Sequence, residues 1–504
     1  MTEQDKHIKD GADGASSAII TFSNQRSYTI AVVRMAAGAL LAFCGTAFWP
    51  IIAESILGVS MVKVAPACRV VSVVLLIAGV MIIVREWSAH TLRIERIRLA
   101  IRLVVFFFAA IVGMVFLEGL LRLVAPVRAT ATVWTPAAIE CGWALPPSFC
   151  GVEFSLETGR RVPFRTNSAG WRDIEFNAAR QPAVFRVVIL GDSQVQGYGL
   201  AFEDTIAFRL REALSRRGYG SEVEILQAGC EGWGTDQELL ALESRILPLK
   251  PDLALLSFTL ENDPVDNLYS QHIYGLERKP VFRQGEDGEL VYVPAPRRPG
   301  SPLLGPFLGG LQIVKRLRIL LRGVLYRIQP LDESGLPPSH LDSRFPDPAV
   351  RPRVPDYGGR HVDLLRDRSG YSPFSVPESP RMAYAWDVTR MLLRRMHKAC
   401  GGAGSRFIVM EPRGMLYAGS PPMDITQGGV PIRLDFQAGM RRLSKICQEE
   451  GVPLLLPPLV EKGCFHADGH LLPKGNRILA EYLADWLISQ HWFPRPRQPG
   501  LSNG

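Results

Sequence analysis

Three long apolar runs dominate the first part of the chain. Met35–Ala53 carries no charge and is about as long as a bilayer-spanning helix. Val70–Val84 is shorter, but it extends past one arginine whose long side chain can reach the membrane surface. Leu103–Leu117 is the third run. A buried core helix explains the second run alone but not three runs in succession, so the pattern predicts about three transmembrane helices within residues 29–126.

Positive charge predicts how these helices are oriented. Residues 1–28 are polar and predict a flexible tail, which is long for a signal peptide and lacks a small-residue cleavage site. The densest positive cluster lies between the second and third runs: Arg85, Arg93, Arg96, Arg98 and Arg102. Placing this cluster in the cytoplasm puts the tail inside and everything after Pro126 outside. We therefore expect a multi-pass protein of the cell inner (cytoplasmic) membrane with an extracytoplasmic, periplasmic soluble part. Two helices in place of three would reverse this orientation.

The remaining chain alternates short apolar runs with amphipathic patterns. Residues 127–184 predict a lead-in of strands and loops packed on the following domain, and 185–492 predict an α/β domain. The expected strands are Phe185–Leu190, Val223–Leu226, Leu253–Phe258, Phe407–Met410 and Val452–Leu456. Helical patterns lie between them, as in Thr205–Arg216 and Thr235–Ile246. Such alternation predicts a parallel sheet covered by helices on both faces.

An insertion interrupts this alternation at about residues 268–382. Ser301–Ile328 contains an amphipathic helix with an arginine- and lysine-rich face. Such a helix rests on an anionic membrane surface, acts as a lid or, most commonly, packs on its own domain. Residues 330–380 predict a long exposed loop, and 493–504 a tail.

Composition narrows the function classes. The net charge is +8, but the basic residues are scattered or flank apolar runs, and no zinc-type pairing accompanies them, so we expect no nucleic-acid partner. Eight cysteines in 504 residues do not make a disulfide scaffold or show metal-ligand spacing. Cys141 and Cys150 enclose a short loop that a disulfide would close in an oxidising compartment.

Candidate chemistry begins where the first strand of the α/β domain ends, at Gly191-Asp192-Ser193. Ligands of open α/β sheets bind at the carboxyl ends of the strands. A serine there has an exposed hydroxyl and nearby backbone N–H groups, which suits a nucleophile with an oxyanion in its transition state. A serine that merely caps the next helix is the alternative.

A histidine that could act as the general base follows the last strand. Of the nine histidines, only His466 and His470 lie at this same edge of the predicted sheet. Asp468, two residues before His470, is a candidate to hold the imidazole in the required tautomer. His466 is the weaker alternative as the base.

Candidate oxyanion donors follow the second and third strands. Gly232 lies in a glycine-rich turn where backbone can approach a reacting atom, and Asn262 offers a side-chain amide. Each also fits an ordinary turn or cap. The acidic set Glu261, Asp263 and Asp266 invites a metal interpretation, but no histidine accompanies it, so we expect neither a metal nor a cofactor.

These residues in this order resemble the SGNH, or GDSL, family of serine esterases and acyltransferases over roughly residues 160–490. The resemblance implies a three-layer, flavodoxin-like fold. It also implies Ser193 as nucleophile and oxyanion donor, Gly232 and Asn262 as further donors, and Asp468 and His470 as acid and base. The phrases Arg165-Thr-Asn-Ser-Ala-Gly-Trp-Arg-Asp173 and Gly234-Thr-Asp-Gln-Glu238 look like the membrane-anchored bacterial branch. Two positions depart from the family pattern: Leu260 stands where a glycine is usual, and Asp468 precedes His470 by two residues where three are common.

The resulting expectation is a membrane-anchored extracytoplasmic serine esterase or deacylase. It would act through an acyl-enzyme on acylated envelope glycans or lipids. An O-acyltransferase that modifies a cell-envelope or exported polysaccharide, together with membrane-bound modification partners, would use the same residues. A non-catalytic binding or assembly protein on the same scaffold is the third possibility.

Overall fold

The computed structural model describes residues 140–295 and 364–493 most fully. It describes residues 34, 37, 77–78, 80–82, 93–124, 140–272, 278–295, 311, 313–314, 364, 367–427, 430–459, 461, 463–467 and 469–493. Two compact units divide the chain. One comprises residues 1–127 and 297–330, and the other comprises 128–296 and 331–504. The predicted tails and most of the predicted loop 330–380 lie outside the described residues.

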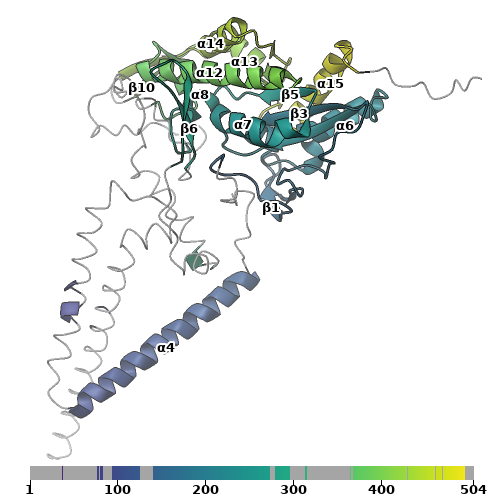
Figure 1. Cartoon of the computed structure of the whole chain (residues 1–504). Helices are drawn as coiled ribbons and strands as arrows, with labels where there is room; N and C mark the ends of the chain where they lie inside the picture. Colours follow the sequence, from purple (N-terminus) through teal and green to yellow (C-terminus); the bar gives the residue numbers. More distant parts are fainter. Residues whose placement is uncertain are drawn as a thin grey trace, which may run out of the picture. The chain divides into compact units, whose positions relative to one another are not determined.

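The first unit contains helix α4, Arg93–Val124 (Figure 1). Within it, Ile101–Leu121 is an apolar stretch of 21 residues of which none is buried, about the length that crosses a bilayer. It is the one such helix in the described part of the chain, and the predicted spans Met35–Ala53 and Val70–Val84 lie almost wholly outside that part. The helix begins at Arg93, so the last ten residues of the predicted loop are helical, since Arg, Glu, Leu and Ala all favour helix.

Only residues 311, 313 and 314 of the predicted amphipathic segment Ser301–Ile328 are described. Ile313 and Val314 are helical, and the Ile313 backbone N–H donates to a carboxylate oxygen of Glu118 at 3.1 Å. Residues 297–330 are grouped with α4 in the first unit.

A five-stranded parallel sheet forms the centre of the second unit. Its strands are β3 (Phe185–Gly191), β4 (Val223–Gly229), β5 (Leu253–Ser257), β9 (Arg406–Met410) and β12 (Leu454–Leu455). They pair in the order β12-β9-β5-β3-β4. In chain order this is the 2-1-3-4-5 arrangement of flavodoxin-like folds. The predicted α/β class, with its parallel sheet, is confirmed.

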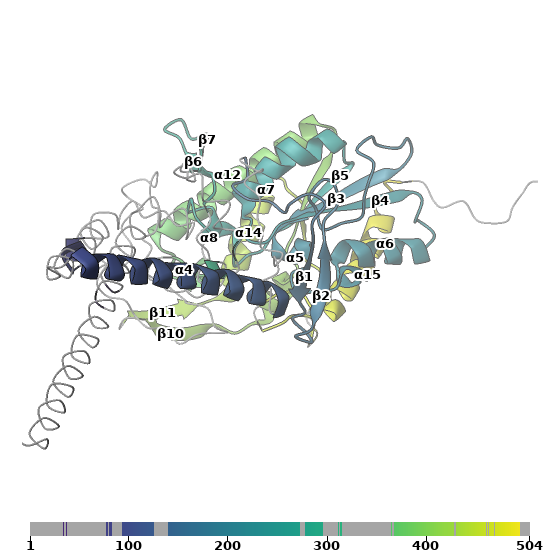
Figure 2. The same ribbon diagram turned by 90° about the horizontal axis from the view of Figure 1, so that it is seen from below.

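Helices cover both faces of this sheet (Figures 1 and 2). On one face α6 (Ile206–Arg216) lies beside α15 (Pro473–Ser489) over Val187, Ile189 and Leu255. Helices α7 (Thr235–Ala241), α12 (Pro380–Gly402) and α14 (Phe436–Glu449) cover the other face, whose core includes Val188, Leu190 and Leu256. Alternate residues of each strand therefore enter opposite cores, as a doubly covered sheet requires.

The sequence before the first strand is part of the same fold. Hairpin β1 (Cys150–Phe154) and β2 (Arg161–Arg165) lies in the lead-in. Trp143 Nε1 donates to the Glu231 carbonyl at 3.0 Å, and Trp233 Nε1 donates to the Trp143 carbonyl at 2.9 Å. These reciprocal bonds join the lead-in to the turn after β4.

Smaller elements complete the unit. Helices α5 (Ser193–Gln196) and α8 (Asp263–Asp266) follow β3 and β5, and α13 (Gly414–Gly419) follows β9. Strands β6 (Val281–Gln284) and β7 (Leu290–Val293) form a hairpin inside the predicted insertion. Strands β8 (Ser375–Val376), β10 (Met423–Gln427) and β11 (Val430–Leu434) form a separate small sheet.

Candidate active site

The turn after β3 presents Ser193 at the carboxyl edge of the sheet. Strand β3 is buried throughout, and its neighbours β5 and β4 run on opposite sides of it. This is the topological switch point, where open α/β folds bind their ligands. Gly191 permits the sharp turn, since a Cβ there would lie 2.5 Å from a Val195 methyl and 3.1 Å from the Ser257 carbonyl oxygen. Ser193 is the first residue of α5 and is 5% exposed.

His470 meets Ser193 across the fold. Its Nε2 lies 2.9 Å from Ser193 Oγ, although the two residues are 277 positions apart. The Tyr198 ring packs on the imidazole with 4.8 Å between centroids. Asp468, the predicted orienting acid, lies outside the described residues. His466 lies at the base of the same loop, where its backbone N–H donates to the His470 carbonyl at 2.8 Å, and the ring that meets Ser193 is that of His470.

Gln194 links the loop of residues 466–471, called here the histidine loop, to α5, the helix that carries Ser193. Gln194 Nε2 donates to the Gly469 carbonyl, and the Leu471 backbone N–H donates to Gln194 Oε1, both at 3.0 Å. The two bonds therefore reach the backbone on both sides of His470.

Asn262 lies beside the turn that carries Asp192 and Ser193. Its Nδ2 donates to Asp192 Oδ2 at 2.9 Å, while Asp192 Oδ1 accepts the Gln194 backbone N–H and caps α5. One Nδ2 hydrogen of Asn262 is thus held by Asp192, and an amide has a second one to offer. Leu260, the departure from the family pattern, is fully buried in the core, and its backbone N–H donates to Glu411 Oε2 at 2.9 Å.

Gly232 occupies the turn after β4 with φ +74°, a conformation that favours glycine. A Cβ at this position would lie 2.5 Å from Nε2 of His272, so the half-buried His272 imidazole lies directly against Gly232. The Glu231 backbone N–H donates to Gln196 Oε1 at 2.7 Å, which ties this turn to α5. Gly232 and Asn262 thus lie on turns that each contact the segment carrying Ser193.

Several buried carboxyl groups lie near the turn that carries Ser193. Asp192, Glu238 and Asp263 are each fully buried. Burial raises the pKa of all three; mutual repulsion among them raises the pKa of Glu238 and Asp263 further, while hydrogen bonds and the charge of His470 partly offset the effect at Asp192. Burial likewise raises the pKa of Glu411 to about 8. Burial therefore opposes the ionisation of each of these carboxyl groups.

The acidic residues do not form a metal centre in the described part of the chain. Glu261 is paired with Arg413, and Asp263 Oδ2 accepts the Thr259 backbone N–H at 3.0 Å. Among the described residues, no three histidine, cysteine, aspartate or glutamate side chains gather in a way that could hold a metal ion. Cys141 is buried and Cys150 is exposed, and both are free thiols, so the disulfide left open by the sequence is not formed.

Sequence reasoning missed several residues that hold the site together. Arg172 is almost fully buried and donates to the carbonyls of Gln196, Gly197 and Leu200, which fixes the turn after α5. Its place in the phrase Arg165–Asp173, which resembles the bacterial branch, was the available signal. No local sequence pattern predicts the contact of Tyr198 with His470 or that of His272 with Gly232, since each joins two segments that are distant in sequence.

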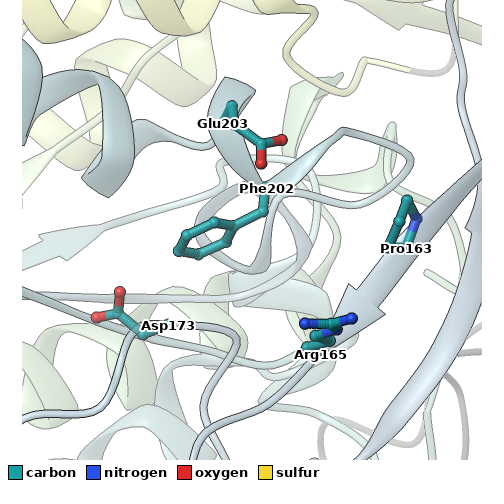
Figure 3. A pocket seen from close by; sticks show the side chains of 5 residues that line it. All are labelled: Pro163, Arg165, Asp173, Phe202 and Glu203. Carbon is teal, nitrogen blue, oxygen red and sulfur yellow. The ribbon is translucent and has the colours of Figure 1, made fainter.

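A separate hollow lies between β2 and the short helix Phe202–Asp204. It has a volume of about 440 Å³ and is lined by Pro163, Arg165, Asp173, Phe202 and Glu203 (Figure 3). The carboxylate of Asp173 is already bonded to Arg211 at 2.6 Å and to the Gln227 backbone N–H at 2.7 Å. None of the residues proposed for catalysis lines this hollow.

Comparisons with protein families, curated proteins and solved structures found distant structural similarity and no sequence match. No protein-family model and no curated protein matches the sequence. Among solved structures, the chain is similar to a lipase/acylhydrolase from Enterococcus faecalis at 12% identity and a TM-score of 0.29, covering 62% of this chain and all of that one. It is also similar to the acetyl xylan esterase AlAXEase at 13% identity and a TM-score of 0.29, covering 61% of this chain and all of that one. Function is therefore inferred from the geometry of the site itself.

Proposed function

We propose that this protein is a serine esterase or deacylase whose nucleophile is Ser193 and whose general base is His470. The observation that carries the proposal is the 2.9 Å contact between Ser193 Oγ and His470 Nε2 at the switch point of the sheet. A serine hydroxyl within hydrogen-bond reach of an imidazole is the arrangement that activates a nucleophile. Asp468 is proposed as the residue that orients His470.

The first half of the reaction forms an acyl-enzyme. Ser193 Oγ attacks the ester carbonyl carbon while its proton passes to His470 Nε2, and the carbonyl oxygen becomes an oxyanion. The backbone N–H groups of Ser193 and Gly232 and the remaining Nδ2 hydrogen of Asn262 are proposed as its donors. The C–O bond of the tetrahedral intermediate then breaks, and the alcohol leaves with the proton from His470.

The second half releases the acid. His470 takes a proton from water as the water oxygen attacks the acyl carbonyl, and the collapse of the second intermediate returns that proton to Ser193. If a sugar hydroxyl replaces water, the same residues transfer the acyl group to a glycan. Hydrolysis is our primary proposal, and O-acyl transfer to an envelope or exported polysaccharide, with membrane-bound partners, is the alternative.

Acylated envelope glycans or lipids are the proposed substrates because of the proposed location. The exposed apolar stretch of α4 supports anchoring in a membrane. The three spans, the inner-membrane location and the extracytoplasmic placement follow from the apolar runs and the arginine cluster of the sequence.

Fluorophosphonate labelling of the full-length protein in detergent tests the proposal. Wild type should become labelled at one serine, and Ser193→Ala and His470→Ala should not. Folded wild-type protein that stays unlabelled, and that cleaves no p-nitrophenyl ester of any chain length, would favour a non-catalytic binding protein. Products formed from an acyl donor and an oligosaccharide then separate the two catalytic possibilities, because transfer leaves the oligosaccharide acylated.

A further inference from the structure

We propose that Gln194 is a positioning residue that sets the histidine loop against the nucleophile, so that acylation depends on its side-chain amide. The inference rests on the proposed function, since it assigns Gln194 a role in the approach of His470 to Ser193. Gln194 follows Ser193 directly and is 8% exposed, so its amide faces the protein interior.

The two bonds of Gln194 resemble one step of a β-ladder. Its Nε2 donates to the Gly469 carbonyl and its Oε1 accepts the Leu471 N–H, each at 3.0 Å. A donor and an acceptor on one planar amide therefore engage an acceptor and a donor on the backbone either side of His470. A single hydrogen bond would leave the loop free to pivot about it, whereas two bonds in one plane fix both position and direction.

The loop needs such a hold because it is short and irregular. Gly469 adopts φ +91°, and the loop is closed by the bond from the His466 N–H to the His470 carbonyl. These contacts lie within the loop and do not fix its place relative to α5. Gln194 supplies that fix, and Tyr198 adds a contact to the imidazole ring from the same segment. Residues 193–198 thus supply the nucleophile, the backbone hold and the ring contact together.

The chemistry of the clamp requires glutamine. Glutamate has the same shape and accepts the Leu471 N–H, but an ionised carboxylate cannot donate to the Gly469 carbonyl. Leucine is similar in volume and makes neither bond. The series Gln194→Glu and Gln194→Leu therefore removes first one bond and then both, while the packing volume is nearly kept.

The experiment measures acylation and loop protection on the same full-length protein in detergent. For Gln194→Leu we expect kcat for p-nitrophenyl acetate, and the rate of fluorophosphonate labelling, to fall by about 10- to 100-fold, as small misplacements of catalytic groups do. KM should stay within about threefold, because the clamp does not contact substrate. Gln194→Glu should lie between Gln194→Leu and wild type.

Hydrogen exchange provides a readout that does not depend on activity. Loss of the bond to Oε1 should speed exchange of the Leu471 amide by about fivefold or more in Gln194→Leu, which corresponds to one hydrogen bond. Gln448→Leu changes an exposed glutamine on α14 and is the matched control, with no expected effect on either measurement.

The possible outcomes separate this inference from the proposed function. Gln194→Leu that is labelled at the wild-type rate overturns the positioning role, and so does unchanged exchange at Leu471. A larger KM together with an unchanged rate of fluorophosphonate labelling also overturns it, since acylation would then be intact and the effect would indicate a substrate contact. If wild type is never labelled while Leu471 exchange still responds to Gln194→Leu, the esterase proposal fails and the hold on the histidine loop stands.

Discussion

Glu411 should make the stability of the α/β unit depend on pH. It follows β9 directly and is fully buried. Its Oε2 accepts the Leu260 N–H at 2.9 Å, and its Oε1 accepts the Arg413 N–H at 2.8 Å. Burial raises its pKa from 4.5 to about 8; these N–H donors oppose the rise, and the charge of Asp192 adds to it.

The difference between the folded and unfolded pKa of Glu411 determines the direction and the size of the change in the free energy of unfolding with pH. The folded protein keeps the Glu411 proton up to about pH 8, whereas the unfolded chain releases it near pH 4.5. Between these values the folded state binds more protons, so the free energy of unfolding falls as pH rises. At about 1.4 kcal/mol per pKa unit, ionisation of Glu411 stabilises the unfolded chain by about 3 kcal/mol at pH 7, and the free energy of unfolding is lower by that amount than in acidic solution.

Glu411→Gln isolates this effect, because glutamine keeps the shape and cannot ionise. Its amide accepts only one of the two N–H bonds, so we expect a pH-independent loss of about 1–2 kcal/mol. Urea unfolding of the full-length protein in detergent, followed by tryptophan fluorescence, gives the free energy at each pH. Between pH 5 and pH 7 wild type should lose about 2–3 kcal/mol more than the variant.

Glu449, an exposed carboxylate, provides the matched control. Glu449→Gln removes an exposed carboxylate on α14 whose partner Lys445 lies 3.7 Å away, so its stability should parallel wild type at every pH. If Glu411→Gln also parallels wild type between pH 5 and pH 8, Glu411 ionises normally and the account of its burial is wrong.

Three further changes test the site and its surroundings. Gly232→Ala should destabilise the protein and slow fluorophosphonate labelling more than Gly288→Ala does. Both glycines have φ above +70°, but a Cβ at Gly232 would meet the His272 side chain, whereas a Cβ at Gly288 would have nothing within 4 Å. Thermal melts and labelling rates compare the two variants. Asn262→Ala should lower kcat for p-nitrophenyl acetate by about 10²- to 10³-fold with a small change in KM, as expected for loss of one oxyanion donor, and an unchanged kcat would remove Asn262 from that role. A maleimide at pH 7 should modify the exposed Cys150 in the folded protein but not Cys141, whose burial raises its pKa to about 12. Mass spectrometry of the peptides checks this, and a modified Cys141 would show that its thiol is not buried.

The parts of the fold that follow from local pattern were predictable. Apolar strands alternating with amphipathic helices give the parallel sheet, and all five predicted strands are present within a few residues of their expected ends. Ser193 and His470 were placed at one edge of the sheet by their positions after strands, and the structure brings them together. The roles of Gly232, Asn262 and Asp468 in catalysis stay predictions.

The contacts that hold the site were beyond sequence reasoning because they pair distant residues. Nothing local marks Gln194 as the partner of a loop 275 positions away. Arg172 and Glu238 also mislead a simple pattern, since charged residues are usually exposed and these two are buried.

The hydrogen bonds of Arg172 to the turn after α5 limit where the chain can be shortened without disturbing the proposed site. Cutting the chain just before Phe185 would look natural, since the first core strand begins there. Such a fragment would lack the guanidinium that binds the Gly197 and Leu200 carbonyls, and also Trp143, which bonds to the turn before Gly232. Those carbonyls would be left without their charged donor beside the nucleophile. A fragment that keeps the proposed site intact therefore has to start before Trp143, and proteolysis between residues 174 and 184 with release of the lead-in would remove these donors while leaving Ser193 and His470 in place.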